Sequence, residues 1–512
     1  MEKIISIEKK SLIEYAKDFA LLNGLSMRTR EHPDSSDTIE HAPFTLFPSY
    51  FDETSFYYVK NLQKHIQMLY YKVSQDIPFL IETHKDIVNQ DNLIKGLCNV
   101  LIKSSIDPSP QQFNLILQRS DYMPHVNSNN KIEIKQVEVN NIAVSMGGLG
   151  NAIENLHRNI LNIFFKDVIL NQEDIYLPEK SNPAKLCAEG LVTALKYYHI
   201  IDYNDNPKRG MLLYGNSLPL NCASILTVTE DVSRNIFDQR HIEAEIQYLT
   251  NYNVKNFRIP LSQLNSRLTL DENKKLFLDK KYEIGLVYYR TGYSIDQYND
   301  ETNDWDTRLL IEKSAAIKCP SIGLQLANTK KMQQVLANKC VLKKYVYDDE
   351  VVEKIFKSFA KLWPLGGDSD EEKLVIKDAK SNPDKYVLKP QTEGGGGNFF
   401  GKDIPNLLNS LSKTELKCYI LMEKLHPTPT ENFLIRPNQK VEKSQVVSEL
   451  GIYGWLIADK KNIFPNRNST YYSYMMRTKE STTNEGGICV GAACLDSIIF
   501  KNFEKDFYTN FI

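Results

Sequence analysis

The chain has 512 residues, a formal net charge of -2 at pH 7, and 42% hydrophobic and 25% charged side chains. This length and composition predict a folded protein with one large core or two to three smaller ones. The near-neutral charge argues against nucleic acid or a membrane surface as a partner. No apolar run reaches membrane-spanning length, and the first residues carry scattered charges where a signal peptide would need an apolar block.

The cysteines and the motif inventory narrow the class further. Eight cysteines stand singly, without a CxxC pair, which is typical of reduced thiols and predicts a cytoplasmic protein. The sequence has no GxxxxGK[ST], no complete GxGxxG and no GxSxG. These absences disfavour P-loop, Rossmann-dinucleotide and serine-hydrolase chemistry.

The first third of the chain predicts helices and then a half-buried strand. Apolar residues recur at three and four positions over 56–73, which predicts an amphipathic helix, and a short strand is expected over 113–117. Alternating residues over 132–139 predict a second strand whose face carries Glu138 and Asn140. A carboxylate and an amide oxygen there suit a hard cation, although an ordinary solvent-facing strand edge is the alternative. A helix with Ile153, Leu156, Ile160 and Ile163 on its apolar face should follow.

The middle of the chain predicts a small α/β unit. Apolar blocks of strand length over 210–230 are followed by a helix over 235–252 and by strands over 255–259 and 282–290, and this strand, helix, strand order favours a parallel sheet. Ligands collect at the carboxyl ends of strands in such sheets, so Arg290 is a candidate anchor for a carboxylate. A helix over 305–318 should follow, and the segment 325–338 supplies Lys330 and Lys331 before another helix, while the charged, turn-rich segment 366–384 is expected to be a surface excursion.

The last third contains a glycine-rich loop between predicted strands. A strand over 386–388 ends at Lys389 and is followed by Glu393 and four consecutive glycines, Gly394 to Gly397. Such a loop can turn backbone N–H groups towards phosphates, although a flexible hairpin is the alternative for glycines alone. A later strand over 446–457 carries Glu449 among apolar residues, where a metal ion or a lysine would serve as its partner.

These elements supply the parts of a nucleotide-dependent phosphoryl-transfer site. Glu138, Asn140 and Glu393 offer oxygen ligands of the kind that Mg²⁺ takes, with phosphates and water filling the remaining positions. Three lysines are placed to neutralise phosphate charge, namely Lys330, Lys389 and Lys479. Positioning and electrostatic stabilisation supply most of the catalysis in such reactions.

At this point long blocks of the sequence resemble a known family. APFTLFPS, RSDYM, RNIFDQRHIE, QLANTKKMQQ, VLKPQTEGGGGN, SELGIYG and MRTK occur in an order that resembles eukaryotic glutathione synthetases, which are ATP-grasp ligases, over nearly the whole chain. The resemblance implies that ATP phosphorylates the cysteinyl carboxylate of γ-glutamylcysteine. Glycine then attacks the acyl phosphate, which yields glutathione, ADP and phosphate. It also implies Mg²⁺ as cofactor, ATP as co-substrate and a homodimer.

The resemblance further implies an α+β and α/β fold. An ATP-grasp core of antiparallel sheets with flanking helices would be interrupted by a parallel α/β substrate-binding subdomain and preceded by a helical N-terminal region. We expect the boundaries at 1–207 for the N-terminal region and first part of the core, 208–325 for the substrate subdomain, and 326–512 for the nucleotide-binding part.

Carried over position by position, the resemblance implies the following site residues. The catalytic set is Arg119, Lys389 and Arg477. The ATP-binding set is Glu138, Lys330, Lys389, Glu393, Gly394, Gly395, Gly396, Gly397, Asn398, Phe400, Met422, Glu423, Lys424, Leu425, Glu449, Lys479 and Glu485. The substrate-binding set is Arg119, Ala143, Ser145, Ser233, Arg234, Asn235, Gln239, Arg290, Tyr293, Arg477, Ile488 and Cys489. The metal set is Glu138, Asn140 and Glu393.

The sequence departs from the family pattern at a few of these positions. Gly397 stands where the family has an asparagine, Phe400 where it commonly has a tyrosine, and Ala143 where a serine contacts the dipeptide. Ile488 and Cys489 replace a Val-Ala pair that bears on the incoming amino acid. Ligation to β-alanine or serine in place of glycine therefore stays open, as does a non-catalytic ATP-binding homologue.

Overall fold

One long sheet, to which both ends of the chain contribute, forms the centre of the molecule. The computed structural model describes residues 9–166, 176–199, 223–391, 397–459, 463–465, 472–484, 486–489 and 491–500. The strand order is β16-β3-β20-β19-β17-β5-β6, with β18 beside β17, and all pairings are antiparallel except β20 with β3. The strands are β3 (Phe44–Thr45), β5 (Asn114–Val126), β6 (Ile132–Asn140), β16 (Thr430–Ile435), β17 (Lys443–Ala458), β18 (Ile463–Pro465), β19 (Tyr472–Glu480) and β20 (Cys494–Asp496).

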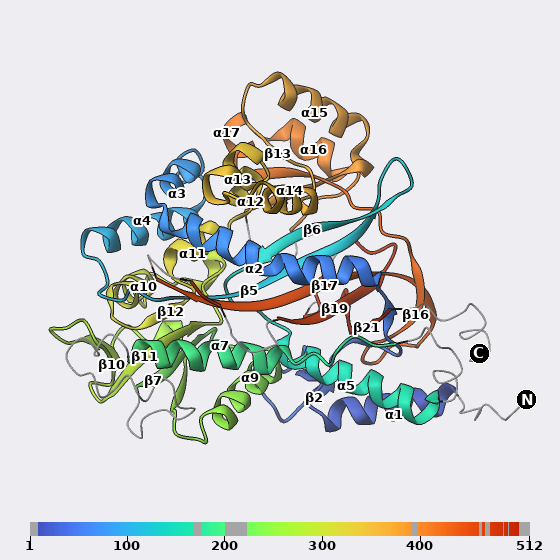
Figure 1. Ribbon diagram of the computed structural model, residues 1–512, viewed down its shortest axis with the longest axis horizontal. Coiled ribbons are helices and arrows are strands. Elements are labelled where there is room, and N and C mark those ends of the chain that lie inside the picture. The colour runs from blue at the N-terminus through green and yellow to red at the C-terminus, as the bar shows by residue number, and fades with distance from the viewer. Residues whose placement is uncertain are drawn as a thin grey trace, which may run out of the picture.

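Helices cover both faces of this sheet. Helix α2 (Glu53–Gln75) packs on β5 and β17 from one side, and α7 (Pro183–Tyr198) packs on the same strands from the other, as Figure 1 shows. The predicted apolar stripe of α2 is confirmed, because Phe56, Val59, Leu62, Ile66, Leu69 and Val73 are all buried. Helix α5 (Gly147–Phe164) packs against α7 and α9 (Ile236–Leu249). Its predicted stripe holds except at Ile163, which is 52% exposed at the end of the helix.

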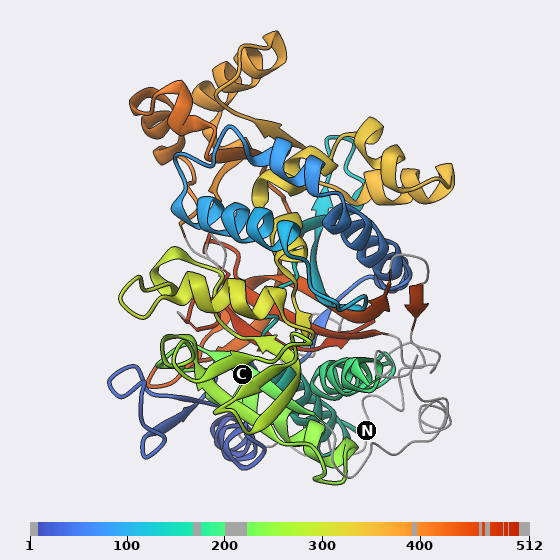
Figure 2. The ribbon, with the colours of Figure 1, turned by 90° about the vertical axis from the view of Figure 1, so that its left-hand side faces the viewer.

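The second sheet is the predicted α/β unit. Strands β8, β7, β11 and β12 run parallel, and β10 and β9 extend the sheet as an antiparallel hairpin. The strands are β7 (Ser224–Thr229), β8 (Asn256–Pro260), β9 (Leu268–Leu270), β10 (Leu276–Leu278), β11 (Tyr282–Tyr289) and β12 (Ile317–Cys319). In Figure 2 this sheet, coloured green, lies below the central sheet.

A third sheet of three antiparallel strands carries the glycine-rich loop. Its order is β13 (Leu362–Pro364), β15 (Tyr419–Glu423) and β14 (Tyr386–Pro390), and it lies at the top of Figure 1 under α15 to α17. The helices are α15 (Asp370–Ser381), α16 (Asp403–Ser410) and α17 (Lys413–Leu416). Val375 and Ala379 of α15 are buried in a core with Leu388 and Leu421 of the strands.

The remaining elements connect these sheets. The helices are α1 (Lys9–Leu22), α3 (Ile77–His84), α4 (Asn92–Ile106), α10 (Asp304–Lys313), α11 (Ile322–Ala327), α12 (Lys330–Leu336), α13 (Lys339–Tyr345) and α14 (Asp349–Ser358). Two short ladders pair β1 (Ser26–Arg28) with β2 (Ile39–His41), and β4 (Ser49–Tyr50) with β21 (Ile498–Ile499). Among the described helices, none is long and apolar enough to cross a membrane.

Three element predictions were wrong in extent or kind. The strand expected over 113–117 continues to Val126, because β17 pairs with it from Asn114 to Tyr122 and β6 pairs with it from Arg119 to Val126. The helix expected over 305–318 ends at Lys313, since residues 317–319 pair with the buried strand β11. The excursion expected over 366–384 contains the helix α15, while the segment 325–338 contains the end of α11 and all of α12.

Candidate functional site

A cavity of about 740 Å³ lies where the three sheets meet. Its lining comes from β5, β6, β14, β15, β17 and β19 and from the loops after β6, β7 and β11. Most of the predicted site residues line it: Arg119, Glu138, Asn140, Ala143, Ser145, Arg234, Asn235, Gln239, Arg290, Tyr293, Lys389, Asn398, Phe400, Met422, Glu423, Lys424, Leu425, Glu449, Arg477, Lys479, Ile488 and Cys489. Segments up to 370 positions apart in the chain therefore form one site.

Some predicted residues lie elsewhere. Glu393, Gly394, Gly395, Gly396 and Glu485 fall outside the residues that the structure describes. Gly397, Ser233 and Lys330 are described but do not line the cavity. Lys330 nevertheless reaches Glu138, and Ser233 contacts Asn235 and Gln239 of the lining.

Five charged side chains form what we call the ion-pair cluster: Arg119, Asp121, Glu138, Glu449 and Arg477. They come from four adjacent strands, where Asp121 lies opposite Glu138 and Glu449 lies opposite Arg477. Residues two apart on a strand share a face, which places Arg119 beside Asp121. The cluster is thus a consequence of strand register rather than of nearness in sequence.

Asp121 is the centre of the cluster. Arg119 donates from Nε and Nη2 to its two carboxylate oxygens, both at 2.7 Å. Arg477 Nη2 and Asn140 Nδ2 each donate to Asp121 Oδ2 at 3.1 Å. Arg477 also binds Glu449, so the partner that the sequence left open for Glu449 is an arginine.

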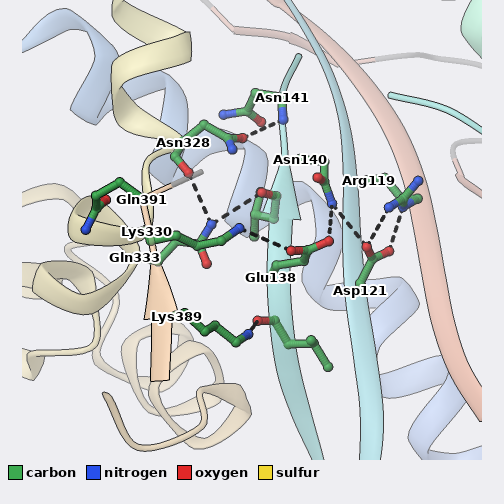
Figure 3. Close-up of polar contacts among 12 residues, drawn as sticks. Arg119, Asp121, Glu138, Asn140, Asn141, Asn328, Lys330, Gln333, Lys389 and Gln391 are labelled. Carbon is green, nitrogen blue, oxygen red and sulfur yellow. Dashed lines mark hydrogen bonds and ion pairs between the residues drawn. The ribbon is translucent and has the colours of Figure 1, made fainter. Parts of the chain in front are cut away.

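Glu138 is the next acceptor along the cavity. Lys330 Nζ lies 3.2 Å from its Oε2 and Asn140 Nδ2 lies 3.3 Å from its Oε1, as Figure 3 shows. Burial alone would raise the pKa of Glu138, but Lys330, Arg477, Lys389 and Arg119 overcome it and hold that pKa well below its usual range. Glu138 is therefore an ionised carboxylate at neutral pH, which can accept hydrogen bonds or bind a cation.

Glu449 behaves in the opposite way. Burial raises its pKa, and the nearby carboxylates Asp121 and Glu138 raise it further against the effect of Arg477. The two glutamates of one cavity therefore have pKa values displaced in opposite directions, which is a common property of functional sites.

The donor set at the end of β6 fits a hard cation. Glu138 and Asn140 project from the same face, as predicted, and lie in contact. Carboxylate and amide oxygens are ligands that Mg²⁺ prefers. No group of three or more His, Cys, Asp or Glu side chains is arranged to hold a metal within the described ranges, and the third predicted ligand, Glu393, lies outside them.

A strained turn brings β6 into α5 at the floor of the cavity. Ala143 and Met146 have φ angles of 49° and 69°, which are uncommon for residues other than glycine. The carbonyl oxygen of Ser145 accepts from Arg119 Nη1 at 3.0 Å and from the Tyr453 hydroxyl at 2.7 Å. The backbone of this turn thus orients Arg119.

Arg290 and Asp238 form a second buried pair behind the turn. Asp238 accepts from the backbone N–H groups of Met146 and Gly148 at 2.9 and 2.8 Å, which caps α5, and from Arg290 Nη2 at 3.3 Å. Arg290 also donates to the Val144 carbonyl and to the Tyr288 hydroxyl. Arg290 Nε lacks a hydrogen-bond partner in the part of the chain that the structure describes.

Arg234 connects the cavity to the β1–β2 hairpin. Its Nε donates to the Arg28 carbonyl at 2.9 Å, its Nη2 to Glu40 at 2.6 Å, and its Nη1 to the Cys489 carbonyl. All three nitrogens are engaged by the protein, so Arg234 braces the segment that carries Cys489. Its predicted contact with substrate stays a prediction.

The opposite wall of the cavity is more apolar. We call Val387, Phe400, Met422, Lys424 and Leu425 the nucleotide wall. Val387 and Met422 are buried on paired strands, and Lys424 Nζ lies 5.9 Å from the centre of the Phe400 ring. Two lysines stand beside this wall, with Lys389 Nζ 3.3 Å from the Val137 carbonyl and Lys479 Nζ 2.6 Å from the Asn484 carbonyl. An apolar slot edged by lysines suits an adenine ring and its phosphates.

Sequence reasoning missed several polar residues in and around the cavity, among them Asp121, Asp238 and Asn328. Asp121 and Asp238 bind the arginines from behind, and Asn328 lines the cavity while its Oδ1 accepts from the backbone N–H of Asn141. Asp121 was within reach, because it lies two positions from the predicted Arg119 on the same strand. Asp238 and Asn328 have hydrogen-bond partners about 50 to 190 positions away, and no local sequence pattern identifies them as site residues.

Comparison with known proteins agrees with this geometry. A family model described as "Eukaryotic glutathione synthase, ATP binding domain" matches residues 6–500. Glutathione synthetase of Xenopus laevis is 34% identical over 495 residues, covering 95% of this chain and 96% of its own. The human glutathione synthetase is 34% identical over 497 residues, covering 96% and 97%. The glutathione synthetase large chain of Schizosaccharomyces pombe is 34% identical over 513 residues, covering 97% and 99%.

A solved structure supports the fold. A glutathione synthetase-like effector from Globodera pallida, in its apo form, superimposes with a TM-score of 0.71 at 24% identity, covering 95% of this chain and 96% of that chain. At this identity the likeness concerns the fold alone. Together with the antiparallel central sheet and the parallel α/β sheet, it confirms the predicted fold class, whereas the predicted domain boundaries stay a prediction.

Proposed function

The chain belongs to the eukaryotic glutathione synthase family, and from this membership we propose that it makes glutathione. The reaction is the ATP-dependent ligation of γ-L-glutamyl-L-cysteine with glycine through an acyl phosphate, with release of ADP and phosphate. The chain is thus an ATP-dependent carbon–nitrogen ligase. The observation that carries the assignment is the single cavity that collects the arginines, the carboxylates and the nucleotide wall.

The ion-pair cluster suits recognition of the carboxylate that becomes phosphorylated. Arg119 on β5 and Arg477 on β19, the two strands that flank β17, present guanidinium groups, and guanidinium forks bind carboxylate and phosphate oxygens in pairs. Phosphorylation moves negative charge from the carboxylate to the transferring phosphoryl group and ADP, and the later attack of the amine builds negative charge on the carbonyl oxygen, so fixed cations can lower both barriers. The proposed mechanism needs no protein nucleophile, because ATP activates the acid.

Mg²⁺ is the proposed cofactor. Glu138, Asn140 and Glu393 would hold it, and when bound it would neutralise charge on the transferring phosphates. Lys330 and Lys389 approach from the other side of Glu138, where they would bind phosphate oxygens. Lowering the pKa of Glu138 keeps the carboxylate charged for this role.

The proposal is tested by turnover with defined substrates. Purified protein, ATP, Mg²⁺, γ-glutamylcysteine and glycine should release ADP, and mass spectrometry should identify glutathione as the product. Absence of ADP release at saturating Mg²⁺ and substrates would reject the ligase and favour a non-catalytic homologue.

The identity of the incoming amino acid rests on the lid residues. Ile488 is buried and Cys489 lines the cavity, and both side chains are larger than the family's Val-Ala pair. A smaller space favours glycine over β-alanine or serine. Comparing kcat/KM for the three amino acids checks this, and a higher value for β-alanine or serine would reassign the product.

We further propose a cytoplasmic homodimer. The seven described cysteines are all free, as expected in a reducing compartment. Leu22 on α1 and Tyr248 on α9 are 84% and 64% exposed, and large exposed apolar side chains are candidates for an interface. Light scattering of the purified protein measures the oligomeric state, and a monomer at micromolar concentration would contradict the proposal.

A further inference from the structure

We propose that Asp121 is the positioning residue that holds Arg119 and Arg477 side by side for the dipeptide carboxylate. The inference rests on the proposed function and adds a role for a residue that the resemblance does not assign. Asp121 does not line the cavity, whereas Arg119, Arg477 and Asn140 do. It therefore acts through its neighbours and does not touch substrate.

The bonding pattern supports this role. Both oxygens of Asp121 are engaged, and its side chain is 1% exposed. The paired bonds from Arg119, each 2.7 Å long, fix the plane of that guanidinium, and the 3.1 Å bond from Arg477 fixes the second cation beside it. Two guanidinium groups bound to one carboxylate would repel each other without it, so Asp121 is needed to keep Arg119 and Arg477 together.

A glycine on the neighbouring strand β17 leaves room for the Arg119–Asp121 pair. Gly451 of β17 lies opposite Asp121, and a Cβ atom there would sit 2.9 Å from Arg119 Cδ and 2.9 Å from Asp121 Oδ1. A side chain at this position would displace both partners. The sheet is thus adapted to the Arg119–Asp121 pair on two strands, which a chance surface ion pair would not require.

The other hydrogen-bond partners of the two arginines also support a positioning role for Asp121. Arg119 has an additional fixed partner in the Ser145 carbonyl, and Arg477 has one in Glu449. Neither of these partners binds both arginines. Among the residues that the structure describes, Asp121 is the carboxylate with hydrogen bonds to both guanidinium groups.

The test separates dipeptide binding from nucleotide binding. In Asp121→Asn, calorimetric affinity for γ-glutamylcysteine in the presence of ADP should fall about tenfold or more and kcat/KM about 100-fold, because a buried charge pair is broken. Affinity for ADP alone should stay within about threefold, since the nucleotide wall is not touched. The control Asp304→Asn changes an equally buried aspartate that binds only the loop before α10, and it should leave both affinities unchanged.

A second variant covers the case in which Asp121→Asn does not fold. Gly451→Ala keeps every charge and displaces the pair, so it should weaken the dipeptide and spare ADP in the same way. Unchanged dipeptide affinity in either folded variant, or equal loss of dipeptide and ADP, overturns the inference. A wild-type protein that binds the dipeptide but makes no glutathione rejects the proposed function alone, because the binding comparison remains valid.

Discussion

The two walls of the cavity are built on different physical principles. The ion-pair cluster consists of charged side chains that hold one another, with Asp121 bound to three neighbours and Glu138 to two. The nucleotide wall is mainly apolar and is built on the paired strands β14 and β15 and the segments next to them, supported by a separate core under α15 and α16.

This difference predicts different responses to mutation. A charge removed from the cluster leaves its partners buried and unpaired, so the effect should spread over several residues. A side chain shortened on the nucleotide wall removes contact area, and such changes are closer to additive. The cluster is therefore the fragile part of the site and the nucleotide wall the tolerant part.

The largest effect is expected from Glu138→Gln. The substitution removes a proposed metal ligand and leaves Lys330 without its carboxylate, so kcat should fall about 1,000-fold. The matched control is Glu423→Gln on the other wall, where the carboxylate accepts only a backbone N–H from Lys361 at 2.8 Å in the described contacts. Steady-state kinetics of both variants measure the contrast, and similar losses would remove the distinction between the walls.

A second effect should appear in stability as a function of pH. His84 is fully buried; it donates from Nδ1 to the Leu80 carbonyl at 2.7 Å, and its Nε2 lies 2.7 Å from the Thr329 hydroxyl. Burial lowers the pKa of His84 to about 4. Because the unfolded chain binds a proton near pH 6.5 and the folded one does not, this group contributes about 3 kcal/mol above pH 6.5 that is lost as the pH falls towards 4.

Thr329 caps α12, whose first residue, Lys330, contacts Glu138 of the ion-pair cluster. His84 therefore acts on the cluster through Thr329 and Lys330. Urea unfolding at several pH values should show a slope between pH 6.5 and 4 that is reduced by up to about 1.4 kcal/mol per pH unit in His84→Gln. His157, whose pKa is also lowered to about 4 by burial, keeps part of the slope in that variant. An unchanged slope would show that His84 is not buried in its neutral form.

The cluster also marks the limit of sequence reasoning. The alternation over 132–139 was sufficient to place Glu138 and Asn140 on one face, because a strand has a period of two. Asp121 lies in a run, residues 118–121, that is polar yet buried, and such a run has no alternation to read. Its meaning depends on Arg477, which is 356 positions away.

Helix α15, beside the three-stranded sheet, is the reverse case, because its local sequence contains helix signals. Helix α15 begins with three acidic residues and has few apolar positions, so its sequence was interpreted as an irregular surface segment. Val375 and Ala379 are buried in the core and Ile376 packs against it, while the N-cap, Ser369, accepts from the backbone N–H of Glu372 at 3.2 Å. Acidic residues in a first turn and a serine cap are helix signals in themselves, and here they accompany apolar residues that face the core.

The smallest effect is expected on the nucleotide wall, at Phe400. Phe400→Ala removes an aromatic face near Lys424, and an aromatic contact of this kind contributes about 0.5–1.5 kcal/mol, so KM for ATP should rise about tenfold at most. The value of kcat should stay within about threefold, because the charges around the reacting carboxylate are unchanged. Phe400→Tyr restores the residue that the family commonly has and should leave both constants as they are. If Phe400→Ala instead lowered kcat as strongly as Glu138→Gln, the two walls would be coupled, and the nucleotide wall would have to transmit its effect to the cluster through Lys389, which approaches Glu138 from β14.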